Sequence, residues 1–354
     1  MDNEDAPPEV VVDALGVPVG IPVTGPDAER LRRQWSRSLS DRSPVVVIEL
    51  DRLHGDGDVA TDYATTALVT VAALDATKGQ RINIHGGAVA DEDGRTLAVI
   101  GPSGSGKTTA VALLATRLGY LSDETVSLDE ALVVHAHPKP LSVITDPTNP
   151  QVKLSVSPDD AGLLRPPPVS RLHRIVLLHR GEDDSGLVPV APAYAIAEIV
   201  QQTSSLVEVE QPILRLAETI DACGGVWSLR YREIGERLDE LVGLLDREPR
   251  PAPARAHHPW RGTRGLPTPG AWRREPWLDA VEYDDEVVVM VDTEVRVLVG
   301  LGLVLWLALT GPRTLDELVV TTTEQMGDHP DAEGLVAGAL ALLAEDGLVI
   351  GPPA

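Results

Sequence analysis

The sequence predicts a mixed α/β protein with two folded domains. Its 354 residues exceed the usual size of a single domain. Between residues 41 and 247, segments with strand and helix periods follow one another with hairpins among them, which favours a mixed sheet over a purely parallel one. The pattern stops in a segment rich in proline and arginine and then restarts. We therefore divide the chain into an N-terminal extension (1–40), an α/β domain (41–247), a linker (248–276) and a small α+β domain (277–354).

Charge and composition limit the partners of the chain. Lys and Arg number 30 against 54 Asp and Glu, and the formal net charge of −24 would repel a nucleic-acid backbone. The hydrophobic fraction of 43% with 24% charged residues is typical of globular proteins. The most apolar stretch, Val297–Leu309, is shorter than the about 20 residues that a membrane-spanning helix needs. We expect no nucleic-acid partner and no membrane partner.

The N-terminus and the cysteine content predict the compartment. The first residues are acidic and include prolines, so they lack the charged and apolar regions of a signal peptide. Cys223 is the single cysteine and has no internal disulfide partner, which fits a reducing environment. We expect a cytoplasmic protein.

The strand signals of the α/β domain begin at Val45–Leu50 and Arg81–His85, the second by strict alternation of apolar and polar residues. Residues 88–90 and 96–100 then predict a hairpin, because the turn at 91–94 ends in glycine. Further strands are expected at Val126–Leu128, Ala131–His135, Ile175–Leu178 and Val226–Tyr231, and further helices over Tyr194–Val200, from Pro212 to Ile220 and from Ile234 to Leu245.

A phosphate-binding motif follows the hairpin. The sequence GPSGSGKT from Gly101 to Thr108 matches G-x-x-x-x-G-K-[ST], and the apolar stripe behind it predicts a helix over Lys107–Leu118 that Gly119 caps. The glycines let backbone N–H groups converge with the helix N-terminus on phosphate charge, Lys107 supplies a cation to the β- and γ-phosphates, and Thr108 supplies a hydroxyl to Mg²⁺. The alternative is a loop that has lost its ligand. We expect ATP, with GTP as the other choice, bound by Gly101, Ser103, Gly104, Ser105, Gly106, Lys107, Thr108 and Thr109.

The class of P-loop protein depends on the neighbouring residues. The ABC-type signature, the GTPase N-K-x-D motif and a Walker B strand at its usual distance are missing. Instead, Asp123 and Glu124 follow soon after the P-loop helix. At a strand edge, Asp123 can hold Mg²⁺ or accept a proton from an incoming hydroxyl, so Thr108, Asp123 and Glu124 are the candidate metal ligands. The simpler interpretation of Asp123 is a turn acid at the end of a strand.

Together these segments resemble the catalytic half of the HPr serine kinase/phosphorylase family. That family has a His-Gly before a hairpin, then a P-loop, then an acid pair ahead of a valine. The resemblance covers about Val45–Leu245 and is strongest over Arg81–Pro140. It implies that Asp123 is the base for an acceptor serine, that His85 supports this carboxylate, and that Glu124 is the second acid, where Asp is usual. Without the resemblance, His85 is interpreted as a core or strand-edge histidine.

Two further features refine this resemblance. The sequence PKPLSV from Pro138 to Val143 resembles the branch of the family that occurs with modified-peptide gene clusters, including those of lasso peptides. The family's downstream Glu-x-Arg-Gly-x-Gly element has no match in the chain. The resemblance therefore implies neither HPr as the substrate nor the phosphorylase reaction.

The linker and the C-terminal domain differ sharply in composition. In the linker, Glu248 and Glu275 are the only acids among many prolines and arginines, so we expect a solvated spacer, with a basic and aromatic docking strip as the alternative. The C-terminal domain predicts three short strands at Ala280–Tyr283, Glu286–Val291 and Glu294–Val299, an apolar helix over Val299–Leu309, a second helix opened by the capping box of Thr314 and Glu317, and a third that Asp331 caps and Gly347 ends.

The helical patterns of this domain are similar to those of PqqD-like domains, which recognise leader peptides in peptide-modifying systems. The similarity implies a small winged-helix-like α+β fold and a leader peptide added as a strand near Glu294–Val299, against the last helix. The alternative is a packing domain without a ligand.

The sequence as a whole predicts an ATP-dependent kinase that transfers the γ-phosphoryl group to a serine or threonine of a precursor peptide. Asp123, His85 and Lys107 are the candidate catalytic residues, and the C-terminal domain would capture the leader. The alternative is a nucleotide-binding scaffold that holds the leader without phosphoryl transfer. A homo-oligomer stays open.

Overall fold

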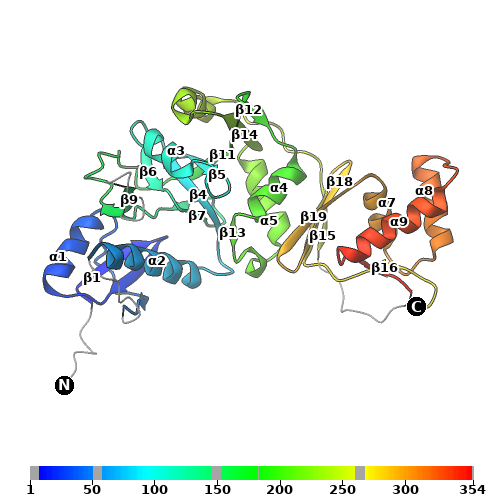
Figure 1. The fold of residues 1–354 in the computed structure, drawn as a ribbon, viewed down its shortest axis with the longest axis horizontal. Helices are drawn as coiled ribbons and strands as arrows, with labels where there is room; N and C mark the ends of the chain where they lie inside the picture. Colours follow the sequence, from blue (N-terminus) through cyan, green and yellow to red (C-terminus); the bar gives the residue numbers. More distant parts are fainter. Residues whose placement is uncertain (1–7, 51–57, 145–152, 182, 260–267, 353–354) are drawn as a thin grey trace, which may run out of the picture. The chain divides into compact units, whose positions relative to one another are not determined.

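The structure is a computed structural model that describes residues 8–50, 58–144, 153–181, 183–259 and 268–352. Residues 1–7 of the expected extension and 260–267 of the expected linker lie outside the described residues. The chain is a mixed α/β protein with a large mixed sheet, small antiparallel sheets and C-terminal helices (Figure 1). It divides into two compact units. Unit 1 comprises Met1–Pro189, Gln202–Ser205 and Val226–Pro249, and unit 2 comprises Val190–Gln201, Leu206–Gly225 and Arg250–Ala354.

The N-terminal part of unit 1 folds around its own apolar cluster. Arg30 and Gln34 of one helix bind Asp62 of the next through side-chain hydrogen bonds, and Trp35 is fully buried between these elements and their sheet. The strand predicted over Val45–Leu50 is confirmed only as a two-residue pairing. The elements are β1 (Val10–Ala14), β2 (Val17–Ile21), α1 (Gly25–Gln34), β3 (Val46–Val47) and α2 (Asp58–Ala76), with the sheet in the order β1-β2-β3.

The large sheet of unit 1 has the order β12-β14-β11-β5-β4-β7-β8, and β6 and β13 also pair with β4. The pairs of β11 with β5 and with β14 are parallel, while β4 pairs with β5 and β7 antiparallel, so the predicted mixed sheet is confirmed. Its strands are β4 (Ile82–Ala90), β5 (Arg95–Ile100), β6 (Gly119–Ser122), β7 (Thr125–Leu128), β8 (Val134–His135), β11 (Arg171–Arg180), β12 (Gly186–Pro189), β13 (Thr203–Ser204) and β14 (Val226–Tyr231). Two further strands, β9 (Leu141–Ile144) and β10 (Lys153–Val156), form a separate hairpin.

Strand β4 joins the elements that the sequence predicted separately. The expected strands 81–85 and 88–90 are one continuous strand, and the predicted hairpin with β5 is confirmed. The predicted strand Ala131–His135 shortens to β8, because Leu132 has a positive φ of 59° and breaks the extended backbone.

Helix α3 (Lys107–Leu114) follows the P-loop but is shorter than predicted. After Ala115, the N–H groups of Arg117 and Leu118 both donate to the carbonyl of Leu114, and the chain leaves the helix in this turn. Leu118 is still part of the apolar core. Gly119, predicted as the helix cap, is the first residue of β6. The closing helical segment of unit 1 comprises the 3₁₀ turns η2 (Ile234–Arg237) and η3 (Leu244–Asp246) on either side of α6 (Leu238–Gly243).

Unit 2 has a four-stranded antiparallel sheet covered on both faces. Every second residue of a strand, such as Val287 and Val289 of β18, packs into the apolar cluster around Trp306 of the C-terminal helices. Helices α4 and α5 also pack on this sheet. Its helices are α4 (Pro192–Val200), the 3₁₀ turn η1 (Leu206–Glu208), α5 (Pro212–Ala222), α7 (Gly300–Ala308), α8 (Leu315–Met326) and α9 (Ala332–Glu345). Its strands are β15 (Ala256–Pro259), β17 (Asp279–Glu282), β18 (Glu286–Val291) and β19 (Glu294–Val299), in this order across the sheet, with β16 (Arg273–Arg274) paired to β20 (Val349–Ile350).

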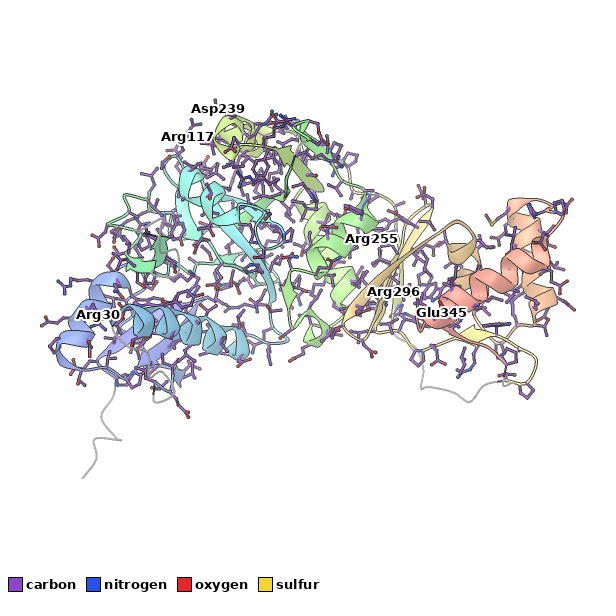
Figure 2. The ribbon with its side chains drawn as sticks, viewed as in Figure 1. Arg30, Arg117, Asp239, Arg255, Arg296 and Glu345 are labelled. Atoms are coloured by element: carbon purple, nitrogen blue, oxygen red, sulfur yellow. The ribbon has the colours of Figure 1, made fainter. Side chains whose placement is uncertain are left out.

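The expected linker contributes to this sheet. The sequence predicted three strands after residue 277 and no regular structure before it, but β15 pairs with β17 as a fourth strand. Arg255, labelled in Figure 2, ties the start of β15 to α5 through ion pairs with Asp221 and with Glu218. Residues 250–259 and 268–276 are therefore part of unit 2 and are not only a solvated spacer.

The C-terminal helices follow the predicted local signals. The capping box of Thr314 and Glu317 is confirmed at the start of α8. Asp331 stands at the N-cap of α9, but its side chain makes no capping hydrogen bond. No helix among the described residues is long and apolar enough to cross a membrane.

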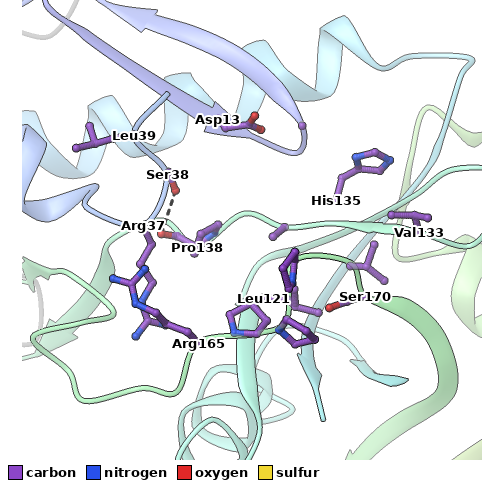
Figure 3. Close-up of a pocket in the computed structure, with 16 residues that line it drawn as sticks. Asp13, Arg37, Ser38, Leu39, Leu121, Val133, His135, Pro138, Arg165 and Ser170 are labelled. Atoms are coloured by element: carbon purple, nitrogen blue, oxygen red, sulfur yellow. Dashed lines mark hydrogen bonds between the residues drawn. The ribbon is translucent and has the colours of Figure 1, made fainter. Parts of the chain in front are cut away.

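A cavity of about 420 Å³ lies within unit 1, between the N-terminal part and the large sheet (Figure 3). Asp13 and Leu39 line it from the N-terminal part, and Leu121, Arg165 and Ser170 line it from the other side. Neither the P-loop nor the acid pair is among its lining residues. The phosphate site is therefore a separate feature.

Candidate functional site

The P-loop has the backbone of a phosphate cradle. Strand β5 ends at Ile100, and α3 begins at Lys107. Gly104 and Gly106 have positive φ values of 82° and 87°, which favour glycine. A Cβ on Gly104 would meet nothing within 4 Å, so the loop is open there. A Cβ on Gly106 would lie 2.5 Å from the hydroxyl of Tyr231, which donates a hydrogen bond to the carbonyl of Ser105 and supports the loop from below.

The side chains of the loop leave donors available for a ligand. The Lys107 amine donates to the carbonyls of Gly101 at 2.6 Å and Pro102 at 3.0 Å, and burial lowers its pKa. The Ser105 hydroxyl is buried without a hydrogen-bond partner in the described chain. Ser103, Thr108 and Thr109 are exposed. An orphaned hydroxyl, an open glycine turn and a lysine held only by loop carbonyls fit an anionic ligand at the start of a helix.

The acid pair lies two strands away from the P-loop strand. On one side of β4, Gly86 pairs with Ile100, the last residue of β5. On its other side, the N–H of Gly86 donates to the carbonyl of Glu124, which lies in the bend between β6 and β7. Two interstrand spacings separate the two backbones by about 10 Å. Asp123 and the start of the P-loop thus lie at the same level across β4.

Strand β4 holds glycines at this level for a steric reason. A Cβ on Gly86 would lie 2.9 Å from the carbonyl oxygen of Val99, and one on Gly87 would overlap the Val111 side chain of α3. Close packing of α3 over β4 therefore requires Gly87, and the close approach of β5 requires Gly86. This packing fixes the P-loop helix relative to the acid pair.

Asp123 is buried and is held through one oxygen. Its side chain is 7% exposed, Tyr120 donates a hydrogen bond of 2.9 Å to Oδ1, and the Lys139 amine lies 3.4 Å from the same oxygen. Within the described chain, no hydrogen bond reaches Oδ2. Burial and then the charge of Asp123 raise the pKa of Tyr120 well above its usual value, so the phenol stays a donor.

Lys139 bridges the acid pair, and its side chain is 8% exposed. Its amine also lies 3.4 Å from Oε2 of Glu124, whose side chain is 40% exposed. Burial lowers the pKa of Lys139, but the charges and hydrogen bonds of both carboxylates outweigh burial and raise it overall. The lysine is therefore a permanent cation at neutral pH.

His85 lies on β4, next to the bend that holds the acid pair. It is opposite Thr125 in the pairing of β4 with β7, and its side chain is exposed. Desolvation and then the Lys107 cation lower its pKa, while Glu124 and Asp123 act in the opposite direction. The ring senses the charges of all three groups, so the structure brings His85, Lys107 and the acid pair into one neighbourhood with a neutral histidine at pH 7.

The residues suit Mg²⁺ only as a partner of a nucleotide. No group of three or more His, Cys, Asp or Glu side chains in the described residues could hold a metal ion. Mg²⁺ in proteins is commonly bound by one or two carboxylates together with substrate phosphates. The exposed Thr108 hydroxyl and a carboxylate of the acid pair fit that arrangement.

Sequence reasoning missed Lys139, Tyr120 and Tyr231 as parts of the site. Lys139 lies in the PKPLSV segment, which carried the resemblance to the modified-peptide branch, and this was the one signal that pointed to it. The two tyrosines are placed by long-range folding, and their spacing in the sequence gives no indication of the contacts.

The sheet of unit 2 has an open edge. In the described part of the chain, β19 pairs only with β18, and the edge strand on the other side, β15, is shorter and ends at Pro259. Val297 is 37% exposed and Val299 is 59% exposed on β19. A strand whose outer edge is unpaired and whose valines are exposed is a surface that an extended peptide can join.

Comparison with known proteins adds no assignment: no protein-family model matches the chain, and no curated protein sequence matches it.

Proposed function

We propose that the chain is an ATP-dependent kinase of the HPr-kinase-like type that phosphorylates a serine or threonine of a precursor peptide. The observation that carries this proposal is the register of β4, which sets the P-loop strand on one side and the Asp123–Glu124 bend on the other. A triphosphate bound by the P-loop would extend toward the acid pair and span the about 10 Å between the two backbones. GTP is the alternative nucleotide.

The chemistry follows from the side chains. Asp123, with its Oδ2 free of hydrogen bonds in the described chain, would take the proton of the acceptor hydroxyl. The hydroxyl oxygen would then bond to the γ-phosphorus as the bond to the β-phosphate oxygen breaks, and the nucleoside diphosphate would leave. Lys107 would stabilise charge on the phosphates, and neutral His85 would help to orient the carboxylate. Mg²⁺, held by Thr108 and the acid pair, would supply charge neutralisation when bound with the nucleotide.

The C-terminal domain would raise the local concentration of the acceptor. A leader peptide added beside β19 would form backbone hydrogen bonds, and Val297 and Val299 would contact its side chains. Tethering converts the encounter with the kinase site into an intramolecular step. We thus propose that the C-terminal domain is PqqD-like, with a winged-helix-like fold, and that it binds the leader peptide.

The test measures phosphate transfer to the cognate peptide by mass spectrometry. Wild type should add one phosphate, and Asp123→Asn should lower the rate by a factor of about 10² to 10⁴, since a general base contributes this much. Nucleotide affinity should stay within a few fold. Asp93→Asn, at an exposed turn acid, is the matched control and should transfer at the wild-type rate. Transfer by Asp123→Asn at the wild-type rate would exclude Asp123 as the base.

One observation favours the scaffold as the second candidate. Lys139 and Tyr120 both bind Oδ1 of Asp123, and a buried carboxylate held by a cation and a donor can serve a purely structural role. A scaffold would bind nucleotide and peptide, and wild type would then add no phosphate under any nucleotide or Mg²⁺ concentration. That result would replace the kinase with the scaffold.

A further inference from the structure

The backbone around Lys139 is held in place independently of the contacts of the Lys139 side chain. Pro138 and Pro140 flank it, and each restricts the backbone. The N–H of Lys139 donates to the carbonyl of His137 at 2.8 Å, and the N–H of His137 donates to the carbonyl of Leu121 in β6 at 2.9 Å. The lysine is therefore held beside the strand that leads directly into Asp123.

The side chain then ends between two carboxylates. Its amine lies 3.4 Å from Asp123 and 3.4 Å from Glu124 in a position where it is 8% exposed. A buried lysine is rare without such pairing, because its desolvation is costly. The contacts are therefore the reason why the amine occupies this place.

Two neighbouring carboxylates in a bend are also a common start of a divalent-cation site. In this chain a side-chain cation stands between them. With Lys139 present, the three groups carry a net charge of −1, and without it the two carboxylates would carry −2 and lose the cation that lies 3.4 Å from each of them. A doubly charged, unpaired carboxylate site attracts a divalent cation more strongly.

We propose that Lys139 is the resident cation of the Asp123–Glu124 pair: it positions Oδ1 of Asp123 and prevents a divalent cation from binding there in the absence of nucleotide. This inference rests on the proposed kinase function, and it adds that Mg²⁺ enters the site only together with the nucleotide. Lys139 is a positioning residue, since it acts through Asp123.

The direct test is Mn²⁺ binding to nucleotide-free, full-length protein, followed by electron paramagnetic resonance of the free ion. Lys139→Met keeps the length of the side chain and removes its charge. This variant should bind one Mn²⁺ at least about tenfold more tightly than wild type. Lys139→Arg keeps a cation and should behave as wild type. The control is Lys78→Met, which removes an exposed lysine 3.2 Å from Asp75, and it should create no site.

Two outcomes would overturn the inference. One is that wild type binds Mn²⁺ without nucleotide as tightly as Lys139→Met does. The other is that Lys139→Met, folded by circular dichroism, gains no Mn²⁺ site. If Lys139→Met does not fold, Lys139→Gln replaces it, since the amide still donates to the carboxylates.

A separate assay distinguishes this inference from the kinase proposal. In peptide phosphorylation, Lys139→Met should lower kcat more than tenfold with little change in the KM for ATP, and Lys139→Arg should restore most of the rate. If wild type transfers no phosphate, the kinase proposal fails while the Mn²⁺ result stands. If wild type transfers phosphate and Lys139→Met binds Mn²⁺ no better, the inference about Lys139 fails alone.

Discussion

Two buried aspartates, one in each unit, are held in opposite ways. Asp279 of unit 2 is 1% exposed, and both of its oxygens are engaged. Its Oδ2 accepts hydrogen bonds from the N–H groups of Ile213 at 2.9 Å and Leu214 at 3.0 Å, and its Oδ1 lies 2.7 Å from His257. Asp123 of unit 1 is 8% exposed, and its described partners, Tyr120 and Lys139, both contact Oδ1.

The difference separates a structural acid from one available for chemistry. Asp279 closes the N-terminus of α5, whose own N-cap, Gln211, makes no side-chain capping bond. Its carboxylate satisfies donors that would otherwise be orphaned. Asp123 has its orientation fixed through one oxygen while the other is left for a ligand. Burial alone therefore does not identify a catalytic acid, whereas the distribution of contacts over its two oxygens is informative.

The largest expected effect is on stability at low pH and concerns His137, whose carbonyl accepts a hydrogen bond from the N–H of Lys139. His137 is fully buried, and desolvation, then the Lys139 charge, lowers its pKa to about 3. The folded chain holds a neutral ring, whereas the unfolded chain takes up a proton below about pH 6.5. Stability from this group is present above pH 6.5 and is lost as the pH falls toward 3, by roughly 5 kcal/mol.

Urea unfolding from pH 7 to pH 4 measures the first part of this loss, roughly 3 kcal/mol. His137→Gln cannot take up the proton and should show a shallower decline, whereas His329→Gln, at an exposed position, should decline as wild type does. Equal slopes for wild type and His137→Gln would show that the ring does not carry the effect.

The next effect concerns the structural aspartate. Asp279→Ala removes the acceptor of two backbone N–H groups and the partner of His257, which should cost roughly 3 kcal/mol of unfolding free energy. Chemical denaturation, monitored by Trp fluorescence, measures it. Asp285→Ala, at an exposed turn acid of the same unit, should change stability by less than about 0.5 kcal/mol. A loss equal to that of the control would remove the distinction between the two aspartates.

The smallest effect is expected for a helix cap that comes from the neighbouring sequence, in contrast to the cap of α5 by the distant Asp279. Thr314 accepts a hydrogen bond from the N–H of Glu317 at 3.3 Å and closes α8 from within its own segment. Thr314→Ala should cost about 1 kcal/mol, because it removes the hydroxyl that caps α8 and leaves in place the reciprocal bond that the backbone N–H of residue 314 donates to the Glu317 carboxylate. If it destabilises the protein as much as Asp279→Ala, local and distant caps contribute equally here.

Features with a local cause could be predicted from the sequence. The P-loop, the strands β14, β18 and β19, and the capping box depend on neighbouring residues, and each was found where the pattern indicated it. The neighbourhood of His85 and Asp123 needed the resemblance, since the pairing of β4 with β7 joins distant segments.

Features with a long-range cause could not be predicted. Helix α2 was missed because threonine, alanine and valine are mixed around it without a clear apolar stripe. The contact of Lys139 with Asp123, the cap of α5 by Asp279 and the addition of β15 to the sheet all depend on chain segments that meet only in the folded state. Their residue types are ordinary, and no spacing connects them.

The pairing of β15 with β17 has a consequence for stoichiometry. With this pairing, β15 is the edge strand on that side of the unit 2 sheet, but it has only four residues and ends at Pro259, which has no N–H to donate, so the six-residue β19 is the better edge for a further extended segment in the described part of the chain. We therefore expect one added strand per chain, and a short edge that ends in proline disfavours the stacking of neighbouring sheets edge to edge.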